Sequence, residues 1–331
     1  MVREVQFIER RAAEWEEWDR ALAPGRKRAG EAAAAIPPER LAGSFRRLCR
    51  DLALARDRQY SAVLAETLQK RVLAAHQRVY GAGGQGWAGL QAIFAFAAAG
   101  FPRLVREEWR VVSLAALLFF LPIAIMLSVL PSFPEAVYLV LSPEQAEHYQ
   151  AMYSPEARHL GRPPKASSQW AMWGFYIANN VRIDFQCFAG GMLFGIGAVF
   201  FMLYNGLSIG TVAGYLTQLG YIHTFWGFVA GHSAFELIGA VLSGAAGLKL
   251  GHALIAPGRK PRLVALKDNA RTAVRLLYGA ATLTFFAAFI EAFWSPLRSV
   301  PFEIKIAVGI ALWALTLAYL LLGGRRRHDA A

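Results

Sequence analysis

Residues 225–250 read FWGFVAGHSAFELIGAVLSGAAGLKL, and this stretch decides the fold class. It is longer than the roughly 20 apolar residues that a helix needs to cross the hydrocarbon core of a bilayer. It also contains His232 and Glu236, although an ionisable side chain at the centre of a spanning helix costs about 2.5–3.5 kcal/mol on insertion scales. Such side chains face protein partners or a cavity. The stretch therefore predicts a membrane protein with a polar site inside it.

The composition of the whole chain agrees with this class. Its 331 residues are 56% hydrophobic and 13% aromatic, and its mean hydropathy of +0.33 exceeds that of an ordinary soluble domain. Residues 1–110 are charged and rich in Ala and Arg, whereas residues 111–322 hold nearly all the long apolar runs. We predict an all-α chain with three parts: a cytoplasmic helical head (1–86), an interfacial elbow helix (87–110) and a polytopic transmembrane domain (111–331).

About six transmembrane helices are expected. Their predicted positions are 111–130, 185–204, 207–221, 225–250, 276–293 and 304–322. An irregular external loop with short helical pieces is predicted over 131–174, and the aromatic stretch 170–184 is expected to enter at the outer interface. Residues 87–101 are apolar but too short to cross, so we expect them to lie at the interface; if they crossed, every later side assignment would invert.

The charge distribution predicts the orientation. The net charge is +12, and the basic residues gather before the first span, in one middle loop and at the end of the chain. These clusters are Arg103, Arg106 and Arg110; Arg259, Lys260, Arg262, Lys267, Arg271 and Arg275; and Arg325 to Arg327. Because cytoplasmic loops carry the excess of Lys and Arg, we expect both termini inside a bacterial inner membrane, with the lipid bilayer rather than nucleic acid as the partner.

Three amphipathic helices are predicted in the head. Ile8, Trp15, Trp18 and Leu22 share one helix face, and similar stripes run over 41–52 and 64–79. The segment GAGGQG at 81–86 formally matches a nucleotide fingerprint, but that fingerprint needs a preceding strand and here a helical pattern precedes it. We expect a linker. The two cysteines, Cys49 and Cys187, fall in different parts of the chain and predict no disulfide, and no signal peptide is expected.

Glycines repeat every fourth residue in three predicted spans. They are Gly206, Gly210 and Gly214; Gly227 and Gly231; and Gly247 and Gly251. This spacing lets helix backbones approach closely in lipid, so we interpret these residues as packing positions. Two alternatives stay open: a transport pathway at broken helices, and self-association into a homodimer.

Polar residues from three predicted helices fall at a similar depth. They are Asn179, Asn180, Arg182, Asp184, His232, Glu236 and Glu291. Because each of these groups is costly alone in hydrocarbon, we expect them to pair, with Arg182 against Glu236 or Glu291 and His232 one turn from Glu236.

Four interpretations of this cluster remain. It is a structural lock, a proton or ion relay, a metal site, or a hydrolytic centre. For a metal, His232 and Glu236 would supply two ligands and Glu291 or His223 a third, but two ligands on one helix are a weak signal. No recognisable nucleophile, base and orienting group occur together. We therefore predict no catalytic residues and no cofactor.

Five segments of the membrane domain carry a family resemblance: IANNVR at 177–182, NGL at 205–207 with Gly210, GHSAFEL at 231–237, SGAAGL at 243–248 with Gly251, and IEAFWSP at 290–296. Through these segments the sequence resembles the stage II sporulation protein M family of bacterial inner-membrane proteins. The head is similar to that of longer members through FIER at 7–10, Trp15, LALAR at 52–56 and FPRLVR at 101–106. One departure is Ser233 and Ala234, where the family usually has glycine and often proline, so we expect a regular helix there.

The resemblance implies a scaffold. The sporulation member joins peptidoglycan-remodelling hydrolases, and longer relatives are often encoded beside a MoxR-type AAA+ ATPase. We expect a non-enzymatic inner-membrane scaffold that assembles envelope or cell-wall-associated proteins. A transporter or channel that uses the polar cluster is the first alternative, and an intramembrane metalloenzyme is the second.

Overall fold

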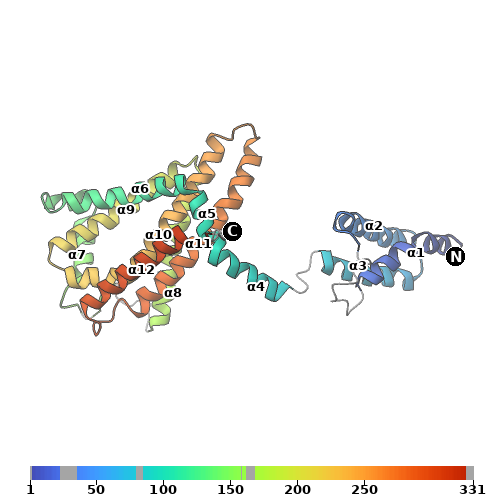
Figure 1. The fold of residues 1–331 in the computed structure, drawn as a ribbon, viewed down its shortest axis with the longest axis horizontal. Helices are drawn as coiled ribbons and strands as arrows, with labels where there is room; N and C mark the ends of the chain where they lie inside the picture. Colours follow the sequence, from blue (N-terminus) through green and yellow to red (C-terminus); the bar gives the residue numbers. More distant parts are fainter. Residues whose placement is uncertain (1, 23–35, 80–84, 158, 162–167, 326–331) are drawn as a thin grey trace, which may run out of the picture. The chain divides into compact units, whose positions relative to one another are not determined.

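The computed structural model describes residues 2–22, 36–79, 85–157, 159–161 and 168–325, and every regular element in these ranges is a helix (Figure 1). The predicted all-α class is confirmed. The chain divides into two compact units, Met1–Ile93 and Phe94–Ala331.

The first unit is a three-helix bundle. Its helices are α1 (Val2–Leu22), α2 (Pro38–Asp57) and α3 (Ala62–Val79), in agreement with the three predicted amphipathic stripes. Trp18, Leu48 and Leu68 are almost completely buried between the helices. Most of the GAGGQG segment, residues 81–84, lies outside the described residues.

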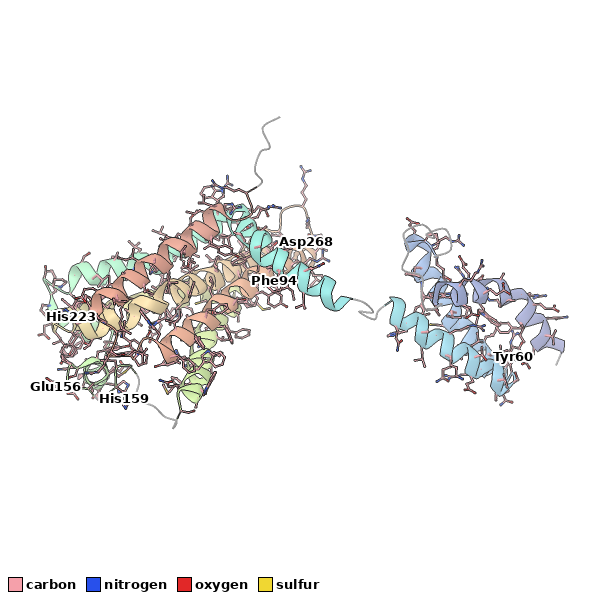
Figure 2. All side chains as sticks on the ribbon, turned by 60° about the horizontal axis from the view of Figure 1, so that its bottom comes forward. Tyr60, Phe94, Glu156, His159, His223 and Asp268 are labelled. Carbon is pink, nitrogen blue, oxygen red and sulfur yellow. The ribbon has the colours of Figure 1, made fainter. Side chains whose placement is uncertain are left out.

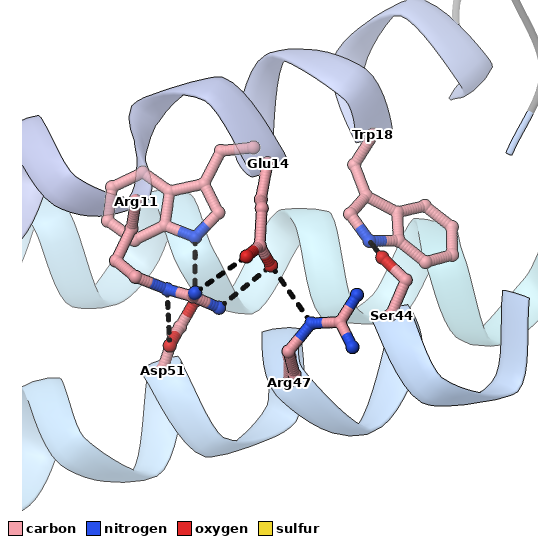
Figure 3. Close-up of polar contacts among 7 residues, drawn as sticks. Arg11, Glu14, Trp18, Ser44, Arg47 and Asp51 are labelled. Atoms are coloured by element: carbon pink, nitrogen blue, oxygen red, sulfur yellow. Dashed lines mark hydrogen bonds and ion pairs between the residues drawn. The ribbon is translucent and has the colours of Figure 1, made fainter. Parts of the chain in front are cut away.

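A polar network joins α1 to α2 (Figure 3). The buried Asp51 carboxylate accepts hydrogen bonds from Trp15 Nε1 at 2.9 Å and from Arg11 Nε at 2.9 Å. Glu14 bridges Arg11 and Arg47 on the same side of the interface. Because each buried polar atom of Asp51 and Trp15 has a partner, the network fixes the register of the two helices.

A continuous helical path leads towards the first span. It comprises α4 (Gln85–Ala95), a π-helical turn η2 (Phe96–Gly100) and α5 (Phe101–Glu107). Gly100 and Pro102 do not end this helix. The Phe101 N–H bonds to the Phe96 carbonyl across the π turn, which leaves the Ala97 carbonyl opposite Pro102, a residue without an N–H. The Tyr319 hydroxyl donates to that carbonyl instead, so the helix continues past the proline.

Within the described residues, five helices of the second unit are long and apolar enough to cross a membrane. They are α6 (Trp109–Val129), α9 (Ile196–Gln218), α10 (Ile222–Ile255), α11 (Arg262–Phe293) and α12 (Phe302–Leu322). The most apolar window of α10 is 72% buried, against 22–39% in the other four, so α10 is the central helix. It runs unbroken through Ser233 and Ala234, as expected for this sequence.

The predicted second and third spans, 185–204 and 207–221, are wrong. Helix α8 (Gln169–Ala189) ends before a short turn, η4 (Gly190–Met192), and α9 then starts at Ile196. The turn requires positive φ angles at Phe194 and Gly195. The backbone of Gly191 packs against that of Gly247 on α10, and the backbone of Gly195 packs against that of Gly251. Sequence periodicity cannot detect this contact, because it depends on a distant glycine pair.

The two ends of the second unit differ in character. Glu156, His159 and His223 lie together at one end, and Asp268 and Phe94 lie at the opposite end (Figure 2). The first end contains the loop after α6, which holds η3 (Pro134–Leu139) and α7 (Pro143–Tyr153), so the predicted short helical pieces are confirmed. At the other end, three basic side chains make local contacts. Arg103 donates to the Gly324 carbonyl, Arg106 donates to the Leu320 carbonyl, and Lys249 pairs with Glu108 at 2.6 Å.

Candidate functional site

Three side chains from α10 and α11 meet in the half of the second unit that lies towards α7. His232 and Glu236 are one helical turn apart on α10, and Glu291 is in the last turn of α11. A ring nitrogen of His232 and one carboxylate oxygen from each glutamate lie within 4.8 Å of one another. His232 Nε2 is 3.6 Å from Glu236 Oε2, which is longer than an N–H···O hydrogen bond. The group is therefore a compact cluster of three potential metal ligands.

The imidazole of His232 is held from its other side. Its Nδ1 lies 2.9 Å from the Ser295 hydroxyl oxygen, and the Ser295 carbonyl accepts a hydrogen bond from Lys305 Nζ at 2.8 Å. Ser295 is completely buried and Lys305 is 4% exposed. Neither residue was expected at the site, because Ser295 lies in an apparent turn and a single lysine near the start of a span suggests an interfacial anchor.

Helix α8 supplies further polar groups beside this cluster. Asn180 is buried and donates to Glu291 at 3.4 Å, and it accepts from Asn179 at 2.9 Å. Asp184, also buried, accepts a hydrogen bond of 2.5 Å from Thr284 on α11. Thr284 was not predicted, although it lies two helical turns before Glu291 on the same face of α11.

A small cavity lies beside Glu236 and the buried polar groups of α8. Its volume is about 30 Å³, and its polar lining residues are Asn180, Asp184, Asn205, Glu236 and Thr284. At about 10–15 Å³ for each probe-sized water position, it has room for about two water molecules. A solute larger than water does not fit in this conformation.

Arg182 does not belong to the cluster, and its predicted pairing with Glu236 or Glu291 is wrong. Its side chain is exposed on the outer face of α8 and forms no ion pair with the residues that the structure describes. Asn180 and Asp184, four residues apart, share the buried face, so a residue midway between them points in the opposite direction. The sequence places Arg182 between Asn180 and Asp184 along the helix but does not give the direction of its side chain.

The loop after α6 packs beside the cluster through aromatic rings, with Tyr153 against Phe228 and Phe228 against His232. Tyr153, at the end of α7, is 7% exposed, and its carbonyl accepts a hydrogen bond from Thr224 on α10. Burial raises the pKa of the Tyr153 hydroxyl well above its ordinary value, and the nearby Glu291 and Glu236 carboxylates raise it further. Tyr153 therefore remains protonated and close to both acids.

The predicted packing glycines all contact other parts of the same chain. A Cβ at Gly206, Gly210 or Gly214 would meet α6, and one at Gly227 would meet Phe302 and Lys305 of α12. At Gly231 it would meet Trp294, at Gly247 the Cys187 carbonyl, and at Gly251 the backbone of Gly195. At each of these glycines, the space beside the Cα is therefore filled by another part of the same chain.

The fold and this site define a polytopic helical membrane protein with a buried polar centre under an ordered loop. The sequence model of the family described as Stage II sporulation protein M matches residues 115–296, more than half of the chain, so the protein belongs to this family.

Two further comparisons bear on the two units. The model of a family described as a domain of unknown function (DUF8413) matches residues 5–81 of the head. An uncharacterized protein from Methanocaldococcus jannaschii is 23% identical over 125 residues, which cover 36% of this chain and 68% of that protein. No solved structure matches the chain.

Proposed function

We propose that this protein is a non-enzymatic scaffold of the bacterial inner membrane, whose head binds a cytoplasmic partner protein while the membrane unit assembles envelope proteins. The observation that carries the proposal is an open groove of about 340 Å³ on the head. It lies between α1 and α3, and its wall includes Ile8, Trp15 and Val63. Val63 is 75% exposed and Ile8 is 37% exposed, so the groove presents apolar side chains to a partner.

The shape and chemistry of the groove suit a partner's amphipathic helix. Its lining includes the apolar side chains of Ile8, Val63 and Leu64, while Glu16 and Arg71 provide one charge of each sign. A helix laid in an apolar groove binds through apolar anchors one turn apart and through polar contacts at the edges. A component of a MoxR-type AAA+ ATPase system is one such partner implied by the family resemblance.

The proposed orientation places the head and both termini in the cytoplasm. Arg103, Lys249 and the basic residues of the loop between α10 and α11 gather at one end of the membrane unit, and this end would face the cytoplasm by the positive-inside rule. Helix α4 exposes Leu90, Ile93 and Phe94, which supports its role as an elbow along the inner surface. The loop that contains α7 would then face envelope partners.

Photocrosslinking tests the scaffold role. A photoreactive amino acid in place of Val63, in full-length protein in native membranes, is expected to give a discrete adduct with another protein. The same substitution at Arg50, an exposed residue of α2 outside the groove, is the matched control and is expected to give none. An absence of protein adducts at Val63, or the same adducts at both positions, would contradict the proposal.

A charge in the groove is expected to release the partner. Val63→Glu should reduce partner recovery by about thirtyfold, because burying an unpaired charge at an interface anchor costs roughly 2 kcal/mol. Arg50→Glu should leave recovery unchanged. Affinity purification of each variant under mild detergent, with quantification of the cross-linked partner, provides the measurement.

A further inference from the structure

We propose that His232, Glu236 and Glu291 form an intramembrane binding site for a divalent transition-metal ion, of which Zn²⁺ is the best match. Imidazole nitrogen and carboxylate oxygen are both zinc ligands, at about 2.0–2.2 Å from the ion. Ligand atoms on one tetrahedral ion are then about 3.3–3.5 Å apart. The three ligand atoms lie within 4.8 Å of one another, so binding requires them to approach by up to about 1.5 Å, within reach of side-chain torsions.

The orientation of His232 agrees with this site. Its Nδ1 contacts the Ser295 hydroxyl at 2.9 Å, and its Nε2 is directed towards Glu236 at 3.6 Å. Metal-binding histidines usually have their second ring nitrogen held by a hydrogen bond, which fixes the ring orientation. Ser295 is held in turn by Lys305 through its carbonyl. The ring is therefore positioned before any ion binds.

The cavity beside the cluster supplies an open position. Glu236 and Asn180 both line the space of about 30 Å³, which has room for a water molecule as the fourth ligand. Three protein ligands with one open position are typical of zinc sites that bind water or substrate. Asn180 also contacts Glu291 and so restrains the third ligand.

Electrostatic attraction also favours a cation at this site. Glu236 and Glu291 are both partly buried, and the attraction between a carboxylate and a cation is stronger where the surroundings hold less water. The Tyr153 ring of α7 packs against Phe228, and Phe228 packs against the His232 ring, so this aromatic stack would limit exchange of the ion with solvent.

Metal analysis of the full-length protein tests this proposal. The protein is stripped with a chelator in mild detergent, reloaded with Zn²⁺, separated from free ion and analysed by elemental mass spectrometry. Wild type is expected to retain about one zinc ion per chain. His232→Ala, Glu236→Gln and Glu291→Gln should each fall to the level of the stripped protein. His223→Ala and Glu303→Gln, which change exposed side chains at the same end of the unit, should retain the ion.

A second measurement keeps the proposal testable if the ligand variants do not fold. Ser295→Ala keeps all three ligands and is expected to bind Zn²⁺ about 10–100-fold more weakly, as for other residues that orient a metal-bound histidine. Co²⁺ bound to wild type should give the visible absorption of a four-coordinate site. Retention of zinc by the ligand variants, unchanged affinity in Ser295→Ala, or the absence of zinc from reloaded wild type would overturn the proposal.

Discussion

Gly206→Ala is expected to destabilise the membrane unit by about 1–3 kcal/mol, although alanine is normally the better helix former. An added Cβ would lie 2.2 Å from the Phe119 carbonyl oxygen of α6. This neighbour is backbone rather than a flexible side chain, so α6 and α9 must separate along their contact. Thermal unfolding in detergent, followed by size-exclusion chromatography of heated samples, measures the effect.

Gly174→Ala is the matched control. Gly174 is also a helical glycine, but a Cβ there has no neighbour within 4 Å. We expect an unchanged or slightly higher unfolding temperature, since alanine restricts the unfolded chain. If both substitutions lower stability equally, close packing of α9 on α6 does not determine the stability of the unit.

Asp51→Ala is expected to destabilise the head by about 2–4 kcal/mol. The substitution removes the acceptor for Trp15 Nε1 and the ion-pair partner of Arg11. Asp51 is 5% exposed and Trp15 is 4% exposed, so the indole N–H is left buried without a partner, and Arg11 loses a partly buried contact. Hydrogen-exchange mass spectrometry on the full-length protein should show faster exchange in peptides from α1 and α2.

Two controls separate this effect from a general loss of charge. Glu66→Ala removes an exposed i,i+4 ion pair with Lys70 on α3 and should leave exchange in the head unchanged. Asp51→Asn keeps an oxygen acceptor for Trp15 and should give an intermediate effect. Unchanged protection of α1 and α2 in Asp51→Ala would show that the network does not hold the bundle together.

The head was predictable because its signal is local. Trp15, Trp18 and Leu48 lie on apolar stripes with a helical period, and such stripes identify a buried face without knowledge of the partner helix. Asp51 was missed because a carboxylate at the edge of a stripe normally faces water. Only the approach of α1 shows that it is buried and bonded.

The membership and the arrangement of the candidate site were each predictable only in part. His232 and Glu236 share a face because they are one turn apart, which the sequence alone states. Their meeting with Glu291 depends on how α10 packs against α11, and the exclusion of Arg182 depends on which face of α8 is buried. A depth along a helix can be estimated from sequence, whereas the direction of a side chain requires the neighbouring helices.

By itself, the sequence determined that this chain is helical, that it enters a membrane and that its long central span carries ionisable groups. These properties depend on apolar length and helical period, which are local quantities. The tertiary structure alone decided that the hairpin between α8 and α9 turns at 190–195, and that Ser295 and Lys305 support His232. Both depend on contacts between residues far apart in the chain, because glycine backbones and buried polar groups acquire their positions only when the helices pack.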